Sequence, residues 1–112
     1  MVELTIDQAL QQAIEAHEAG QIKEADRLYT AILEAQPKHP DANHNMGVLA
    51  VSVGKIQEAL EFFETALAVN PTTAQFWLSY IDALIKLART AEARAVLKIE
   101  PTYFFNNFLR IF

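Results

Sequence analysis

Apolar residues recur at intervals of three and four positions along most of the chain, a spacing that places them on one face of an α-helix. Glycine interrupts this pattern at Gly20 and Gly54, and proline interrupts it at Pro37 and Pro71. No segment alternates apolar and polar residues as a half-buried strand does. The sequence therefore predicts an all-α protein, whose helices are separated by tight glycine turns and by connections that contain proline.

These breaks return at a fixed interval of 34 residues, from Gly20 to Gly54 and from Pro37 to Pro71. Other positions repeat at the same interval: Glu24-Ala25, Glu58-Ala59 and Glu92-Ala93, and Tyr29, Phe63 and Leu97. A fixed interval of this length indicates stacked units, each made of two helices joined by a tight turn.

The repeated residues follow the order of a known motif. The middle period contains Met46-Gly47, Ala50, Gly54, Ala59, Phe63, Ala66 and Pro71, the first contains Ala13, Gly20, Ala25, Tyr29 and Pro37, and the third contains Trp77, Ala93 and Leu97. In this spacing they resemble the tetratricopeptide repeat (TPR) family, whose unit is a helical hairpin of 34 residues. The chain departs from the motif at Ala9, Gln12, Asn43, Ile81 and Ala88.

The resemblance implies an all-α, TPR-type αα superhelix, or solenoid, of three antiparallel helix hairpins plus a C-terminal apolar helix. We expect a single domain over residues 1–112, with repeats at about 6–39, 40–73 and 74–101 and an apolar terminal segment at 102–112. The third repeat is truncated, because Pro101 comes four residues before the period would place it.

Local signals predict the ends of individual helices. Thr5 and Gln8 form a capping-box pattern, so the first helix should begin there and end near Ala19. The following helices are expected at about 21–36, from residue 40 to the glycine at 54, and at about 55–70.

In the third period the leading helix is expected to end near Leu87, with Thr90 capping its partner. Gly47 lies in the middle of a predicted helix, where glycine costs about 1 kcal/mol relative to alanine. We interpret Gly47 as a contact point at which a neighbouring helix leaves no room for a Cβ atom.

Composition limits the classes of function that we expect of this chain. The net charge is -5 and the basic residues are scattered, so the chain has no stripe that could neutralise nucleic-acid phosphates. It has no cysteine for disulfides or thiolate chemistry, and no apolar run of about 18 residues that could span a membrane. We expect a cytoplasmic protein without nucleic-acid or membrane partners.

No recognisable pattern of catalytic or metal-binding residues is present. His39 and His44 lie five positions apart across a proline, and His17 belongs to another repeat, so the three histidines do not form a metal-ligand pattern. The sequence has no glycine-rich phosphate loop and no nucleophile elbow. We therefore expect neither an enzyme nor a bound cofactor or metal.

The resemblance favours a non-catalytic protein-protein interaction module that binds a polypeptide segment in the concave groove of the TPR array. Helical spacing places polar candidates for this groove on the leading helices: His17, His44, Asn45, Ser52, Gln75, Asp82 and Lys86. Leu10, Val48, Leu78 and Ile85 share these faces, and they either pack adjacent repeats together or anchor the ligand.

The last residues are strongly apolar, with Arg110 as their single charge. Candidate oligomer contacts in this tail are Tyr103, Phe104, Phe105, Phe108, Leu109 and Phe112. The tail could fold back as a lid over the third repeat, pair with a second chain or a partner, or mark a truncated parent. Two rival functions follow: an N-terminal adaptor of a larger bacterial transferase, or a self-assembling structural unit.

Overall fold

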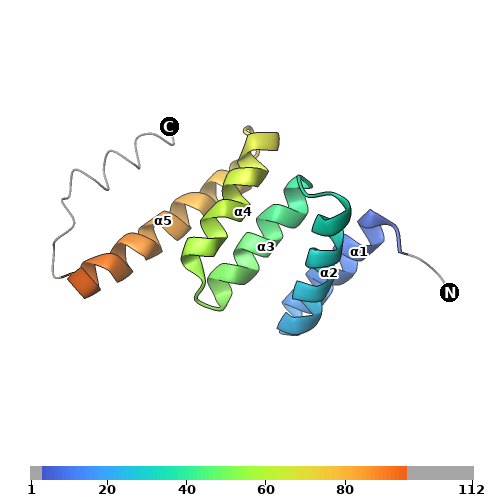
Figure 1. Ribbon diagram of the computed structural model, residues 1–112, viewed down its shortest axis with the longest axis horizontal. Coiled ribbons are helices and arrows are strands. Elements are labelled where there is room, and N and C mark those ends of the chain that lie inside the picture. Colours follow the sequence, from blue (N-terminus) through green and yellow to red (C-terminus); the bar gives the residue numbers. More distant parts are fainter. Residues whose placement is uncertain (1–3, 96–112) are drawn as a thin grey trace.

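The structure is a computed structural model that describes the backbone of residues 4–95 and the side chains of residues 4–89. Its helices, in chain order, are α1 (Ile6–Glu18), α2 (Ile22–Ala35), α3 (Pro40–Ser52), α4 (Ile56–Val69) and α5 (Ala74–Ala95) (Figure 1). Over these residues the all-α prediction is confirmed, and successive helices pack as pairs in the manner of TPR hairpins.

The helices form two layers. Helix α1 packs on α2, and α3 packs on α4, so each glycine turn joins two helices that contact each other. Helices α1, α3 and α5 also pack against their neighbours within one layer, whereas α2 and α4, in the other layer, have no Cα atoms within 8 Å of each other (Figure 1). The α2–α4 layer is therefore splayed, while the α1–α3–α5 layer is closed.

The predicted signals at the helix ends are present. The Thr5 hydroxyl accepts the backbone N–H of Gln8 at 3.1 Å, and the Gln8 side chain accepts the backbone N–H of Thr5 at 2.9 Å. Gly20 and Gly54 have φ values of +77° and +84°, a left-handed conformation that favours glycine. This conformation ends α1 and α3 where the sequence predicted.

The core is built from residues one period apart. Tyr29 and Phe63 are each 1% exposed, and the alanines at Ala25 and Ala59 are fully buried. A Cβ atom added at Gly47 would lie closer than 3.0 Å to three ring atoms of Phe63. The interpretation of Gly47 as a point of close helix approach is therefore confirmed, since only a hydrogen at this position leaves space for the ring.

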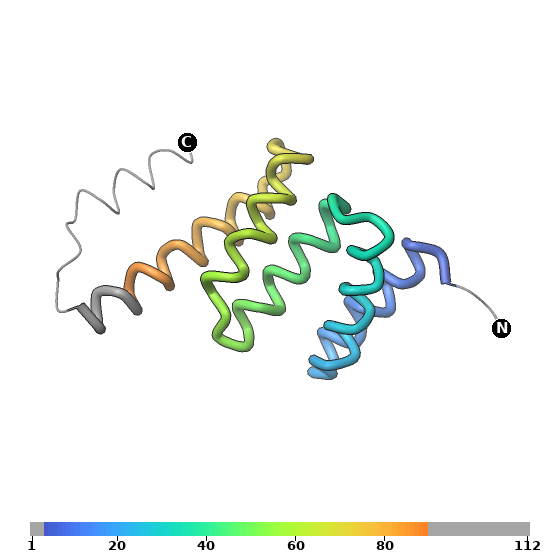
Figure 2. The backbone as a smooth tube through the Cα atoms, in the orientation of Figure 1, coloured from blue at the N-terminus to red at the C-terminus, as the bar shows by residue number. Residues whose placement is uncertain are grey.

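The third period departs from the prediction. The expected end of its leading helix near Leu87 is wrong, because α5 continues without a break to Ala95 and Thr90 lies inside it. Figure 2 shows the chain doubling back after α1 and after α3, whereas helix α5 has no break between Ala74 and Ala95. Ala88 stands where the earlier periods have glycine, and its Cβ disfavours the left-handed turn conformation by about 1–2 kcal/mol.

The predicted trailing helix of the third repeat therefore does not begin at Thr90. Residues 96–112 lie outside the described residues, and with them the predicted C-terminal apolar helix and six candidate oligomer contacts. Those contacts, Tyr103, Phe104, Phe105, Phe108, Leu109 and Phe112, stay predictions.

Candidate protein-interaction surfaces

A polar cluster joins α3 to α5. The Ser79 Oγ lies 2.7 Å from Nε2 of His44, whose Nδ1 lies 3.2 Å from Oδ1 of Asn45. An amide oxygen can only accept, so Nδ1 donates to Asn45, and in the neutral imidazole Nε2 then accepts the Ser79 hydroxyl. The Gln75 side-chain nitrogen lies 3.5 Å from the same Ser79 oxygen. Two predicted groove residues, His44 and Gln75, thus meet through Ser79.

The imidazole of His44 is fixed by aromatic rings as well as by hydrogen bonds. It stacks on Phe76 with ring centroids 4.8 Å apart, and it lies 5.7 Å from the ring of Phe63 at a tilt. The His44 side chain is buried, and this burial lowers its pKa, against the opposing effects of the Asn45 hydrogen bond and the Asp41 charge. Burial therefore favours the neutral form of His44 in the interface between the second and third periods.

The Ser79–His44 pair has the atoms of a nucleophile and a general base, but its surroundings give it a structural role. His44 is only 7% exposed, and its ring is packed against two phenylalanines. Its two ring nitrogens are both engaged, one on α3 and one on α5. The pair therefore connects two helices and fixes the positions of Asn45 and Ser79 at the surface.

We call the solvent-facing side of the α1–α3–α5 layer the inner surface. Helical spacing puts Gln75, Ser79, Asp82 and Lys86 along one stripe of α5. Asp82 and Lys86 are joined by an ion pair of 2.8 Å, which is exposed and therefore contributes little to stability. Leu78 lies beside this stripe and is 61% exposed.

The remaining predicted groove residues are less exposed or are engaged locally. Ser52 donates its hydroxyl to the backbone oxygen of Leu49 within α3, at 2.6 Å. His17, on α1, is half-buried and meets the ring of Tyr29 edge-on, with centroids 6.3 Å apart. The structure thus gathers His44, Asn45 and Gln75 into one cluster, with Asp82 and Lys86 further along α5, while Ser52 and His17 make separate local contacts.

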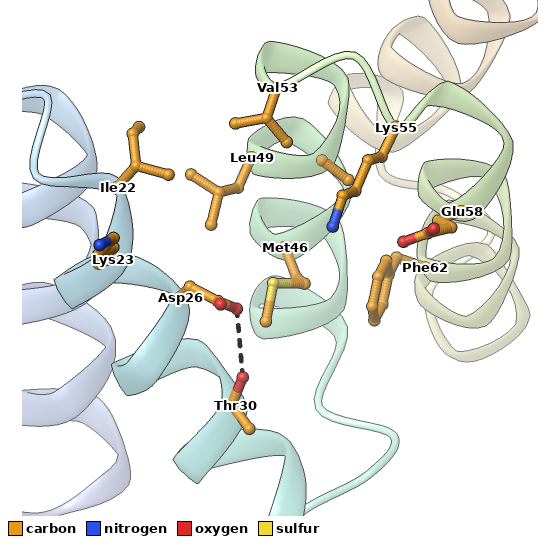
Figure 3. Close-up of a pocket in the computed structure, with 11 residues that line it drawn as sticks. Ile22, Lys23, Asp26, Thr30, Met46, Leu49, Val53, Lys55, Glu58 and Phe62 are labelled. Atoms are coloured by element: carbon orange, nitrogen blue, oxygen red, sulfur yellow. Dashed lines mark hydrogen bonds between the residues drawn. The ribbon is translucent and has the colours of Figure 1, made fainter.

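A second surface, the outer groove, lies between α2 and α4 above α3 (Figure 3). It encloses about 460 Å³. Its lining residues are Ile22, Lys23, Asp26 and Thr30 from α2, Met46, Leu49, Ala50 and Val53 from α3 and its C-terminal end, and Lys55, Glu58 and Phe62 from the N-terminal half of α4 and its cap. The groove lies where α2 and α4 stand apart over α3, and Met46, Leu49 and Ala50 of α3 are each less than 9% exposed beneath it.

Neither the contact between Ser79 and His44 nor the outer groove was predicted from the sequence. Ser79 follows His44 by 35 residues, one period plus one, so the repeat interval itself could have paired them. The outer groove has no comparable signal, because it depends on the distance between two helices rather than on residue types.

Comparison with known proteins agrees with the helical hairpins. Residues 50–99, which include all of α4 and α5, match the family described as tetratricopeptide repeat. No match was found among curated proteins. Repeats of this kind typically serve as non-catalytic modules that bind other proteins. Among the helices in the described part of the chain, none is both long enough and apolar enough to cross a membrane.

Proposed function

We propose that the protein is a non-catalytic interaction module, built from helical hairpins of the tetratricopeptide-repeat type, that binds a polypeptide segment of another protein along its inner surface. The observation that carries this proposal is Leu78, a large apolar side chain that is 61% exposed beside a row of ordered polar groups. An apolar anchor next to fixed hydrogen-bonding groups is the arrangement that peptide-binding surfaces use.

The polar groups suit an extended chain. The amides of Asn45 and Gln75 each carry donors and an acceptor, the same groups that a peptide backbone presents. The interaction of Asn45 with His44, and that of Gln75 with Ser79, restrict both side chains before a ligand arrives. A preorganised surface of this kind loses less conformational entropy on binding.

The test uses random peptides displayed on phage, selected on the wild-type chain and then titrated as synthetic peptides. Leu78→Glu should weaken binding at least about tenfold, because it replaces the apolar anchor with a charge. Asn45→Ala should weaken binding less, by about threefold to tenfold, since it removes one hydrogen-bonding group.

Val69→Glu is the matched control, because Val69 is 42% exposed but lies at the end of α4, in the other layer. It should leave the affinity unchanged. Failure to select any peptide, or equal affinity for the wild type and Leu78→Glu, would show that the inner surface is not the binding site.

A further inference from the structure

In the first two periods, one side of the leading helix is covered by the helix that follows it in the chain. Ala13 and Ala16 of α1 are buried in a cluster with residues of α2. Gly47 and Ala50 of α3 are buried against α4, where Gly47 meets the ring of Phe63. We call this side of a leading helix its hairpin face.

The hairpin face of α5 is apolar and only partly covered. Ile81 and Leu84 follow Gly47 and Ala50 by 34 positions, and Trp77 lies one turn before Ile81. All three α5 residues are half-buried, whereas Gly47 and Ala50 are buried. Helix α4 covers one edge of the face, through Trp77 and Leu84, but no described helix follows α5 to cover the rest.

The indole of Trp77 presents apolar surface on this face. Its Nε1–H donates to the backbone oxygen of Pro71 at 2.6 Å, so the one polar atom of the ring already has a partner. The ring also meets that of Tyr80 at a tilt, with centroids 6.5 Å apart. The rest of the indole gains from apolar contact, by about 25 cal/mol for each Å² removed from water.

The described surfaces of a second copy offer no matching stripe. On α1, Gln12 and Glu15 stand where α3 has Met46 and Leu49, so the first helix of a copy is polar at the positions by which α3 packs against α2. Large apolar side chains that are exposed among the described residues each lie on a different segment: Leu4, Val53, Val69 and Leu78. Apart from a second hairpin face, the apolar stripe must therefore come from the tail.

The tail, residues 102–112, has the composition that this face requires. It contains five aromatic and two aliphatic residues and a single charged side chain. Phe104, Phe108 and Phe112 are spaced at i, i+4 and i+8, so in a helix they form one apolar stripe. Pro101 directly precedes the tail, and proline suits the first turn of a helix.

The chain's own tail can reach the face. As a helix the tail is about 16 Å long, which equals the length of α5 from Trp77 to Ala88. To lie antiparallel to α5, it must begin about 10 Å back from Ala95, near Ala88, and stand about 10 Å to the side. This path is about 14 Å, whereas the connection from Ala95 to residue 102 spans up to about 23 Å when extended.

The short connection also favours the chain's own tail over the tail of a second copy. A segment joined by a few residues meets its site at an effective concentration in the millimolar range, and a second copy must reach that concentration to compete equally. The first two hairpins follow the same rule, because α1 and α3 are each paired with the next segment of their own chain.

We propose that residues 102–112 fold back on α5 of the same chain and cover Trp77, Ile81 and Leu84, in the place that α2 and α4 occupy in the first two periods. Helical spacing puts Ser79 and Asp82 on the other side of α5, so the inner surface stays open. This inference does not depend on the proposed peptide-binding site.

A spin label tests the contact, because the chain has no native cysteine. Asn107→Cys accepts a nitroxide in the tail while keeping every aromatic residue. In NMR spectra of the isotope-labelled chain, the nitroxide should broaden the amide signals of residues 77–88 and of the adjoining part of α4, and leave those of α1 and α2 unchanged. Unbroadened signals in residues 77–88 would overturn the proposal, as would broadening of α3 in place of α4.

A mixed sample identifies the chain that supplies the tail. Spin-labelled chains without isotope are mixed with isotope-labelled chains without cysteine, so any broadening reports contact between copies. The proposal predicts none. Broadening of residues 77–88 in the mixture would assign the face to a second copy and overturn it.

Two variants of the spin-labelled chain test the aromatic stripe. Phe104→Ser/Phe108→Ser should abolish the broadening within the chain, because it removes the apolar side of the tail. Asn106→Ser is the matched control, since position 106 lies on the opposite side of a tail helix, and it should keep the broadening. Equal broadening in both variants would contradict the proposed contact.

Fluorescence identifies the covered face, because Trp77 is the only tryptophan. Phe104→Ser/Phe108→Ser should shift its emission to longer wavelength and make it more accessible to acrylamide, whereas Asn106→Ser should change neither. Emission and quenching that are unchanged in the double variant would overturn the proposal. Peptide binding at Leu78 should be equal in both variants, so this contact and the peptide-binding site succeed or fail separately.

Discussion

The first two periods of the chain turn at glycine, whereas the third carries alanine at the same position and does not turn. After α1, the backbone N–H of Gln21 donates to the oxygen of Ala16 at 2.8 Å, and after α3 the N–H of Lys55 donates to the oxygen of Ala50 at 2.8 Å. The two turns are thus built from the same bond, 34 residues apart, around a residue with positive φ. With Ala88 in this place the helix continues.

The periods also differ where their helices pack. Gly47 lies against the ring of Phe63, and the first period has Ala13 at the equivalent position. The third period has Ile81 there, a residue too large for the same close approach. A TPR-like hairpin therefore needs two features beyond the period, a glycine at the turn and a small residue opposite the aromatic ring.

The largest expected effect comes from giving the second period the residue of the third. Gly47→Ile should destabilise the protein by about 3 kcal/mol or more, because the side chain would overlap the Phe63 ring. Urea denaturation followed by circular dichroism measures this change. The double variant Gly47→Ala/Phe63→Leu should be more stable than Gly47→Ile, because it has a smaller side chain at position 47 and no ring at position 63. If Gly47→Ile lowered the free energy of unfolding by less than about 1 kcal/mol, the close contact between Gly47 and Phe63 would not explain the glycine.

Gly54→Ala should destabilise the protein by about 1–2 kcal/mol, because alanine must adopt a φ value near +84° or the turn must rearrange. A Cβ at this position meets no other atom within 4 Å, so the cost is conformational rather than steric crowding by neighbours. Thermal unfolding of Gly54→Ala and Gly20→Ala should give similar losses. A neutral result for both would show that positive φ is not what ends these helices.

Ala88→Gly gives the third period the glycine of the other two. It should lower the free energy of unfolding by about 1 kcal/mol, because glycine has a lower helix propensity than alanine. It should reduce the protection of backbone amides in residues 89–95 against hydrogen exchange, while α3 and α4 keep theirs. Ala83→Gly, within the same helix but fully buried, provides a control in which packing is lost as well. Unchanged protection after Ala88→Gly would indicate that packing, rather than propensity, holds the end of α5.

The interfaces between periods differ too, because only the one between α3 and α5 contains His44. The smallest predicted effect is the pH dependence of stability that His44 causes. His44 has a lowered pKa, so the unfolded chain binds its proton at higher pH than the folded chain does. The stability linked to His44 is therefore complete above pH 6.5, the ordinary value, and decreases as the pH falls towards the lower folded value.

Replacing His44 with asparagine should remove this decrease between pH 7 and 5, although it also lowers stability at neutral pH. The equivalent position of the first period is Leu10, so the interface between α1 and α3 lacks this histidine contribution. His17→Gln is the control, because it removes a histidine from the same α1–α3–α5 layer without changing the contact between α3 and α5. Urea denaturation at a series of pH values gives the comparison, and equal slopes for wild type and His44→Asn would refute the assignment.

Much of the fold could be predicted because its signals are local and repeated. Thr5 and Gln8 cap α1 as their spacing indicates, and Gly20 and Gly54 end their helices for a backbone reason that can be recognised in the sequence. The end of the third leading helix was predicted from the period alone. The residues around Ala88 favour helix, and no glycine is present to end it. The helix therefore continues past the position at which the 34-residue interval predicts a turn.

The candidate surfaces were predicted less completely. Helical spacing placed Asn45, Gln75 and Asp82 on the right helices, but it could not show that His44 is buried and bonded to Ser79. That contact depends on how far α3 and α5 are rotated about their axes. The outer groove depends on the separation of α2 and α4, which the residue pattern of either helix does not encode.

The Cα chemical shifts of residues 86–92, measured by NMR on the chain of residues 1–112, test most directly whether the third period turns at position 88. We expect Cα shifts typical of an α-helix to continue through Ala88, whereas the helical shifts should be interrupted at Gly20 and at Gly54. A loss of helical shifts at residue 88 would contradict this expectation, because the chain would then turn at all three equivalent positions.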